Sequence, residues 1–169
     1  MADAVPAEPE PKRPKVDQEG SKQNDVDAKE YMSEDEIDPA DWIKYLKQVK
    51  ASEGFDIDDF APIIAEVAYD ITIPMGPMET WEDKEHEMVF GNAKKAIAKF
   101  NEENGTNYEF VDVVKANYDI VAGYIFYITF LAKAADGGIE TFQAKVYDGI
   151  PGDGESAFEI YFCRIKVKN

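Results

Sequence analysis

The residues whose types could support covalent catalysis are a single cysteine and a single histidine, Cys163 and His86. A thiolate activated by a neighbouring imidazole would form a nucleophile and base pair. Cys163, however, lies among alternating apolar residues, where an unpaired cysteine behaves as a small hydrophobic side chain. The sequence therefore predicts no enzyme, with this pair as the alternative, and replacing both residues is expected to change no activity.

Carboxylates and glycines are the next candidates for a site. Residues 34–36 and 56–59 are rich in acids but lack the central glycine of a calcium loop. Residues 148–154 combine acids with glycines but lack the basic groups or helix start that hold phosphate. The sequence predicts neither a metal site nor a cofactor, and these segments are interpreted as solvated acidic turns.

The charge balance restricts the partners that the chain can bind. It has 35 acidic and 18 basic residues, a formal net charge of −17. This charge opposes binding to nucleic acid or to anionic membrane surfaces and favours encounter with basic proteins. One cysteine allows no intrachain disulfide, and the N-terminus has no apolar leader. We therefore expect a reducing, cytoplasmic location and no membrane span.

Residues 1–36 are predicted to be a disordered acidic tail. They contain several prolines, many charges and one aromatic residue, Tyr31, so they cannot bury enough apolar surface to offset the entropy of ordering. Within them, Pro11–Lys15 with its basic residues Lys12, Arg13 and Lys15 resembles a nuclear localisation signal. A solvated charge run is the alternative, and nuclear entry stays open.

Residues 37–169 are predicted to form one domain that begins with a helix. Asp38 and Pro39 are typical of a helix start, and Gly54 offers a left-handed stop. The helix is predicted to bury an apolar stripe formed by Trp42, Tyr45, Leu46 and Val49. Alternation over 67–73 indicates a short strand. A longer helix is expected from Thr80, paired with Asp83 as a capping box, to Asn104–Gly105.

Four strand patterns follow the long helix, over residues 108–118, 124–133, 139–147 and 157–167. A tight turn separates the first two, and Asp136–Gly138 is a hairpin signal between the next two. Alternation with few charges on the inward side predicts a sheet with one covered face. The predicted fold class is therefore α+β, with a long helix across a four- to five-stranded antiparallel sheet and an extra N-terminal helix.

Five stretches in this order resemble the cystatins, and most closely their plant branch. They are Ala96–Asn101, Tyr108–Ala116, Ile120–Gly123, Tyr127–Phe130 and Phe142–Tyr147. Together they place the resemblance over about residues 88–167, and it implies a cystatin-like fold. The upstream stretch Tyr45–Asp56 is similar to the leader of the plant cystatin-related proteins, a group whose activity is mostly unassigned.

Cystatins that inhibit use a three-part wedge to block the cleft of a papain-type cysteine protease. The parts are a flexible N-terminal glycine, a first hairpin of pattern Gln-x-Val-x-Gly and a second hairpin carrying Pro-Trp. The first hairpin corresponds to Asp119–Gly123, in which Asp119 replaces Gln. The second, at residues 148–155, has no Trp, and neither Gly54 nor Gly76 stands ahead of a first strand as the N-terminal glycine should.

The resemblance implies a set of residues that contact a protease. They are Asp119, Ile120, Val121, Ala122, Gly123, Gly149, Ile150 and Pro151. A carboxylate at position 119 would be costly in a closed contact, and the missing Trp removes the residue type that most often carries interface energy. We therefore expect a weak inhibitor acting through the first hairpin. The alternative is a non-inhibitory interaction or regulatory module, in a monomer or a domain-swapped dimer.

Overall fold

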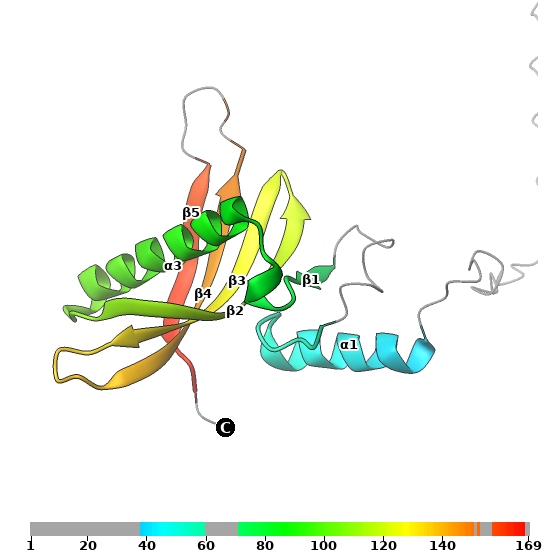
Figure 1. Ribbon diagram of the computed structural model, residues 1–169, viewed down its shortest axis with the longest axis horizontal. Helices are drawn as coiled ribbons and strands as arrows, with labels where there is room; N and C mark the ends of the chain where they lie inside the picture. Colours follow the sequence, from blue (N-terminus) through cyan, green and yellow to red (C-terminus); the bar gives the residue numbers. More distant parts are fainter. Residues whose placement is uncertain (1–37, 60–70, 151, 153–156, 168–169) are drawn as a thin grey trace, which may run out of the picture. The chain divides into compact units, whose positions relative to one another are not determined.

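The computed structural model describes residues 38–59, 71–150, 152 and 157–167 (Figure 1). The helical elements are α1 (Pro39–Ser52), η2 (Met78–Thr80, a 3-10 turn) and α3 (Asp83–Asn104). The strands are β1 (Thr72–Pro74), β2 (Glu109–Val121), β3 (Gly123–Lys133), β4 (Ile139–Gly149) and β5 (Phe158–Ile165). They form one antiparallel sheet in chain order, with α3 lying across it, and this confirms the predicted α+β class.

The predicted tail and its basic cluster lie outside the described residues, as do residues 60–70. Residues 67–70 of the strand predicted at 67–73 therefore lie outside the described residues. The strand that is described, β1, covers Thr72–Pro74 and pairs with residues 117–119 of β2. In the part of the chain that the structure describes, no helix combines the length and apolar character needed to cross a membrane.

The main core lies between α3 and the sheet. One face of α3 buries Val89, Ala93, Ala96 and Ile97. Alternate residues of β3 and β4 meet it, because side chains of a strand point to opposite faces in turn. The sheet residues in this layer include Phe126, Ile128, Phe130, Phe142, Ala144 and Val146. The long helix therefore positions the sheet strands that carry the hairpins.

The start of α3 differs from the prediction. Glu82 caps the helix, and its backbone N–H donates to Glu85 Oε2 at 2.8 Å. The predicted capping box at Thr80 and Asp83 is wrong, because Thr80 ends a 3-10 turn and Trp81 precedes the helix. The predicted stop is confirmed, since Gly105 takes the left-handed conformation at φ 62°.

The N-terminal helix begins as predicted, with Ala40 N–H donating to Asp38 Oδ1 at 2.8 Å. Its buried stripe is narrower than predicted, because Tyr45 is buried while Leu46 stays exposed. The left-handed stop is also shifted, since Glu53 (φ 55°) adopts it one residue before Gly54. The helix packs through Tyr45 against Ile57 and Ile73.

The sheet is covered on both faces, contrary to the prediction of one covered face. We call residues 53–58, which follow α1, the strap. Phe55 and Ile57 of the strap are fully buried, and the Phe55 ring meets Tyr127 edge-on with centroids 5.5 Å apart. Tyr127 alternates with the β3 residues that face α3, so the strap lies on the opposite face. The prediction of one covered face failed because the second cover is the strap, which precedes all the strands in the sequence.

Phe55→Ala should test whether the strap is part of the core. Removing a fully buried Phe is expected to lower the free energy of unfolding by about 3–5 kcal/mol. Urea unfolding followed by circular dichroism would measure it. Ile43→Ala on the exposed side of α1 is the control and should change stability by less than about 0.5 kcal/mol. Equal small losses in both variants would contradict a structural role for the strap.

Candidate functional site

Two hairpin connections lie at the same end of the sheet (Figure 1). In the first, Val121 pairs with Gly123 and leaves Ala122 at the tip. β4 then runs beside β3 as far as the pair Gly123 and Gly149, so the second connection leaves the sheet next to the first. We call residues 120–123, together with Gly149 and Ile150, the hairpin edge. Pro151 lies outside the described residues.

The hairpin edge exposes large apolar side chains. Ile150 is 72% exposed, and Ile120 and Val121 are about half exposed, at 48% and 44%. Tyr124, the cross-strand partner of Ile120, is also exposed. Single exposed apolar residues are common on proteins, but a group of them at one place is typical of an interaction site. The structure thus gathers the predicted contact residues Ile120–Gly123, Gly149 and Ile150.

Gly123 is required by the close approach of β3 and β4. Its φ is 117°, and a Cβ at this position would lie 2.4 Å from the carbonyl oxygen of Asp148. Such a distance is far below van der Waals contact, so any side chain here would push the two strands apart. The glycine of the first hairpin therefore has a local physical cause, which is independent of any partner.

Asp119 is engaged within the protein. Its Oδ2 accepts a hydrogen bond from the Tyr127 hydroxyl at 2.7 Å, on the face of the sheet that the strap covers. Burial, reinforced by this carboxylate, holds the pKa of Tyr127 well above its usual range, so the hydroxyl stays a donor. Among the described residues, the buried Asp119 Oδ1 has no partner. The carboxylate therefore lies behind the hairpin tip and contacts β3.

A second internal link was missed by sequence reasoning. Asn92 is buried on the apolar face of α3, and its Nδ2 donates to Asp148 Oδ2 at 2.9 Å. This bond ties the helix to the end of β4, directly before Gly149. The signal was present, because a polar residue among Val89, Ala93 and Ala96 must find a buried partner. The partner itself could not be read from any local pattern.

The chain enters the sheet beside the first hairpin, since Thr72 of β1 pairs with Asp119. The residues leading to it, 60–70, lie outside the described part. Gly54 lies in the strap, where a Cβ would be 3.0 Å from the Tyr127 ring, and Gly76 follows β1. Neither glycine leads into β1, as the sequence indicated.

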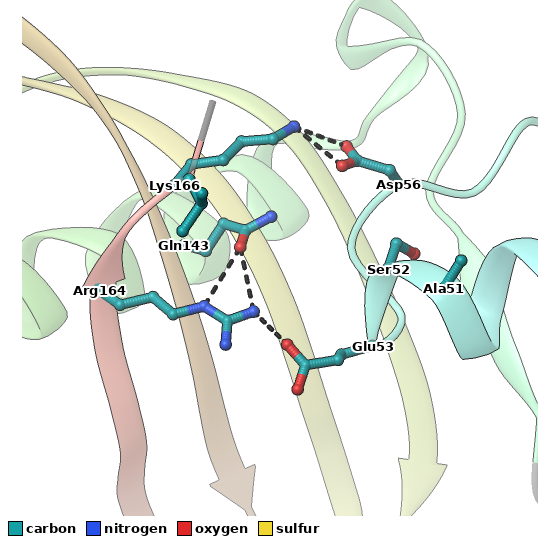
Figure 2. A pocket seen from close by; sticks show the side chains of 8 residues that line it. Ala51, Ser52, Glu53, Asp56, Gln143, Arg164 and Lys166 are labelled. Atoms are coloured by element: carbon teal, nitrogen blue, oxygen red, sulfur yellow. Dashed lines mark hydrogen bonds and ion pairs between the residues drawn. The ribbon is translucent and has the colours of Figure 1, made fainter. Parts of the chain in front are cut away.

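A pocket of about 270 Å³ lies away from the hairpin edge, between the end of α1, the strap and the end of β5 (Figure 2). Its lining consists of Ala51, Ser52, Glu53, Asp56, Gln143, Arg164, Lys166 and Val167. Arg164 Nη2 pairs with Glu53, and Lys166 Nζ lies 2.9 Å from Asp56 Oδ2. Because these charges neutralise one another across the pocket, the arrangement joins the strap to β5.

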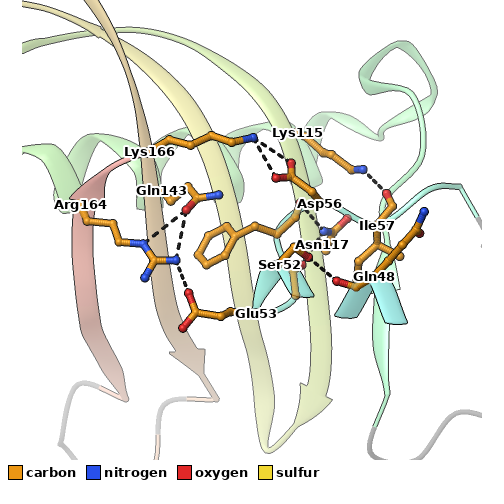
Figure 3. A network of polar contacts seen from close by, with 12 residues as sticks. Gln48, Ser52, Glu53, Asp56, Ile57, Lys115, Asn117, Gln143, Arg164 and Lys166 are labelled. Atoms are coloured by element: carbon orange, nitrogen blue, oxygen red, sulfur yellow. Dashed lines mark hydrogen bonds and ion pairs between the residues drawn. The ribbon is translucent and has the colours of Figure 1, made fainter. Parts of the chain in front are cut away.

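The same contacts belong to a polar network that fixes the strap (Figure 3). The buried Asn117 Nδ2 donates to the carbonyls of Gly54 at 2.6 Å and Phe55 at 3.0 Å. Lys115 Nζ donates to the carbonyl of Ile57, and burial lowers the pKa of this lysine. Exposed ion pairs contribute little to stability, whereas satisfying buried carbonyls avoids a penalty of about 1–3 kcal/mol each. The β2 donors therefore matter more than the exposed pairs.

Cys163 and His86 do not form a catalytic pair. Cys163 is partly buried in β5 against the main core, whereas the His86 ring contacts Trp81 and Phe90. No hydrogen bond joins the two within the described ranges. Nor do three or more His, Cys, Asp or Glu side chains gather there as a metal site would need. Burial raises the pKa of the Cys163 thiol to about 12.

Cys163 should accordingly react slowly with alkylating reagents. With a pKa of about 12, about one thiol in ten thousand is ionised at pH 8, and only the thiolate attacks. Iodoacetamide labelling of the folded protein is expected to be roughly a thousandfold slower than labelling of free cysteine. Mass spectrometry would measure the rate, with the urea-unfolded protein as the control that reacts normally. A native rate within tenfold of free cysteine would contradict the raised pKa of Cys163.

Comparison with known proteins gives one family match. The profile described as the cystatin domain matches residues 76–161, just over half of the chain. The match includes α3, β2, β3 and β4, and with them both strands of the first hairpin. The strap and α1 lie before it. No curated protein matches the chain in sequence.

Proposed function

Because the chain belongs to the cystatin family, we propose that it is a weak inhibitor of papain-type cysteine proteases and binds them through the hairpin edge. The exposed apolar side chains of Ile120, Val121 and Ile150 are the observation that supports this proposal. These side chains lie on adjacent hairpins and extend from the same end of the sheet. Such an edge can enter an open cleft without rearrangement of the sheet.

The strength of binding follows from the number of anchors. Burying a whole Val or Ile side chain is worth about 1.5–3 kcal/mol, and the three apolar residues of the edge are already partly buried. Association costs about 4–15 kcal/mol in lost freedom of motion. The segment from Asp148 to Phe158 contains no Trp that could add a large anchor. These three contacts alone cannot give tight binding, so inhibition is expected to be weak, no stronger than the micromolar range.

The charge of the chain restricts which protease it would meet. With a formal net charge of −17 the protein is repelled by an acidic rim and attracted to a basic one. Asp119 and Asp148 lie just behind the edge, where Tyr127 and Asn92 hold their carboxylates. The preferred protease in this proposal has basic residues around its cleft.

A non-inhibitory interaction module is the second candidate function. The observation that favours it is the additional structure formed by α1 and the strap, which covers the sheet face opposite α3. Residues 45–56, which cover the second half of α1 and most of the strap, are the stretch similar to the plant cystatin-related proteins. We infer that the chain belongs to that group. A pull-down that recovers only proteases would argue against this second function.

Val121→Glu tests the proposed contact. A charge placed in a desolvated contact is expected to weaken inhibition of a papain-type protease by more than about tenfold. The matched control is Ile43→Glu, which puts the same charge at a similarly exposed apolar site on α1. Titration of protease activity against each variant gives the inhibition constants. Wild-type protein without effect at high micromolar concentration would overturn the proposal.

Asp119→Gln restores the side chain expected in the first hairpin. Because position 119 lies behind the tip and bonds Tyr127, the change is expected to alter the inhibition constant by less than about threefold. The same titration measures it, with urea unfolding as a check that the fold is kept. A gain of more than tenfold would show instead that residue 119 itself contacts the protease.

A further inference from the structure

The carbonyl of Ala122, at the tip of the first hairpin, is held by the second hairpin. It accepts a hydrogen bond from the Tyr147 hydroxyl at 2.9 Å and another from the backbone N–H of Ile150 at 3.3 Å. Both donors come from the end of β4, where the second connection begins. One oxygen atom at the tip therefore links two loops that are separated by the whole length of β3 and β4.

Two glycines make this link sterically feasible. Gly123 and Gly149 face each other across β3 and β4. A Cβ at Gly149 would lie 2.4 Å from the Tyr147 hydroxyl and 2.8 Å from Cβ of Ala157. A side chain at 149 would therefore displace the tyrosine from Ala122. The Gly149 N–H also donates to the carbonyl of Ala157 at 2.6 Å, which closes the base of the second hairpin.

We propose that Tyr147 is a positioning residue that couples the two hairpins, so that a partner meets Val121 and Ile150 as one surface. This inference rests on the proposed function for its effect on binding, but the coupling itself is a property of the free protein. A surface ordered before binding loses less freedom on association. The partner is accordingly a protease whose cleft is contacted at two adjacent places at once.

The Tyr147 hydroxyl contributes little to the free energy of unfolding of the whole domain. Its hydrogen bond to Ala122 is exposed, so water can replace the lost donor when the hydroxyl is removed. The aromatic ring stays in Tyr147→Phe, and the pairing of β3 with β4 does not depend on the hydroxyl. The change should therefore affect the order of the hairpin tip without affecting the fold.

Amide hydrogen exchange of the free protein tests the coupling directly. In Tyr147→Phe the Ile150 amide, measured by NMR, should exchange about fivefold faster, because its acceptor is no longer held in place. Tyr161→Phe is the matched control, since Tyr161 is exposed on β5 and its hydroxyl bonds no residue that the structure describes. Unchanged exchange of Ile150 in Tyr147→Phe would overturn the inference.

A double-mutant cycle tests the effect on binding. Val121→Ala, Ile150→Ala and the pair are compared by inhibition of a papain-type protease, in the wild-type and in the Tyr147→Phe background. In the wild-type background the combined loss should differ from the product of the single losses by at least about threefold. In Tyr147→Phe the losses should simply multiply.

The two failures are distinguishable. A wild-type protein that does not inhibit at all overturns the proposed function, while the exchange measurement still decides the coupling. Losses that multiply in both backgrounds overturn the role of Tyr147 in binding, even if the tip becomes more mobile. Faster exchange together with loss of the interaction term supports the inference.

Discussion

β3 buries five consecutive residues, Phe126 to Phe130, and thereby both of its faces. A strand of this kind needs a cover on each side, and the backbone polar groups under each cover need partners. On one side α3 supplies an apolar cover. On the other the strap brings backbone carbonyls against the sheet, and Asn117 satisfies two of them. The remaining arrangement of the domain depends on this double burial.

The burial of β3 on both faces also determines the geometry of the hairpin edge. With β3 fixed on both faces, Tyr127 is held under the strap and draws the Asp119 carboxylate toward it. The Asp119 carboxylate, the charged group of the first hairpin, is thus hydrogen-bonded within the protein. The exposed side chains of Ile120, Val121 and Ile150, which both hairpins contribute, are apolar. The additional N-terminal structure consequently influences the hairpin edge through Tyr127 and Asp119.

Patterns with local causes were predictable. The strands of the sheet, the stop at Gly105 and the tight turn before Gly123 follow from alternation and glycine placement, which are properties of short windows. The position of the strap was not predictable, because its carbonyls accept hydrogen bonds from residues about sixty positions away in the sequence. The bond from Asn92 to Asp148 and the link from Tyr147 to Ala122 are likewise long-range. The residue types in these links predict that each polar group has a partner, but they do not predict which residue the partner is.

The ion pairs of the strap also set an order of events during synthesis. Glu53 and Asp56 are made more than a hundred residues before their partners Arg164 and Lys166, which stand at the very end of the sheet. Until β5 leaves the ribosome, the strap can be held by α1, β2 and β3 but not by its two ion pairs. The nascent sheet is then incomplete on both faces, because β5 also packs Phe158, Ile160 and Cys163 against the core under α3. The two ion pairs are therefore among the last contacts of the strap to form.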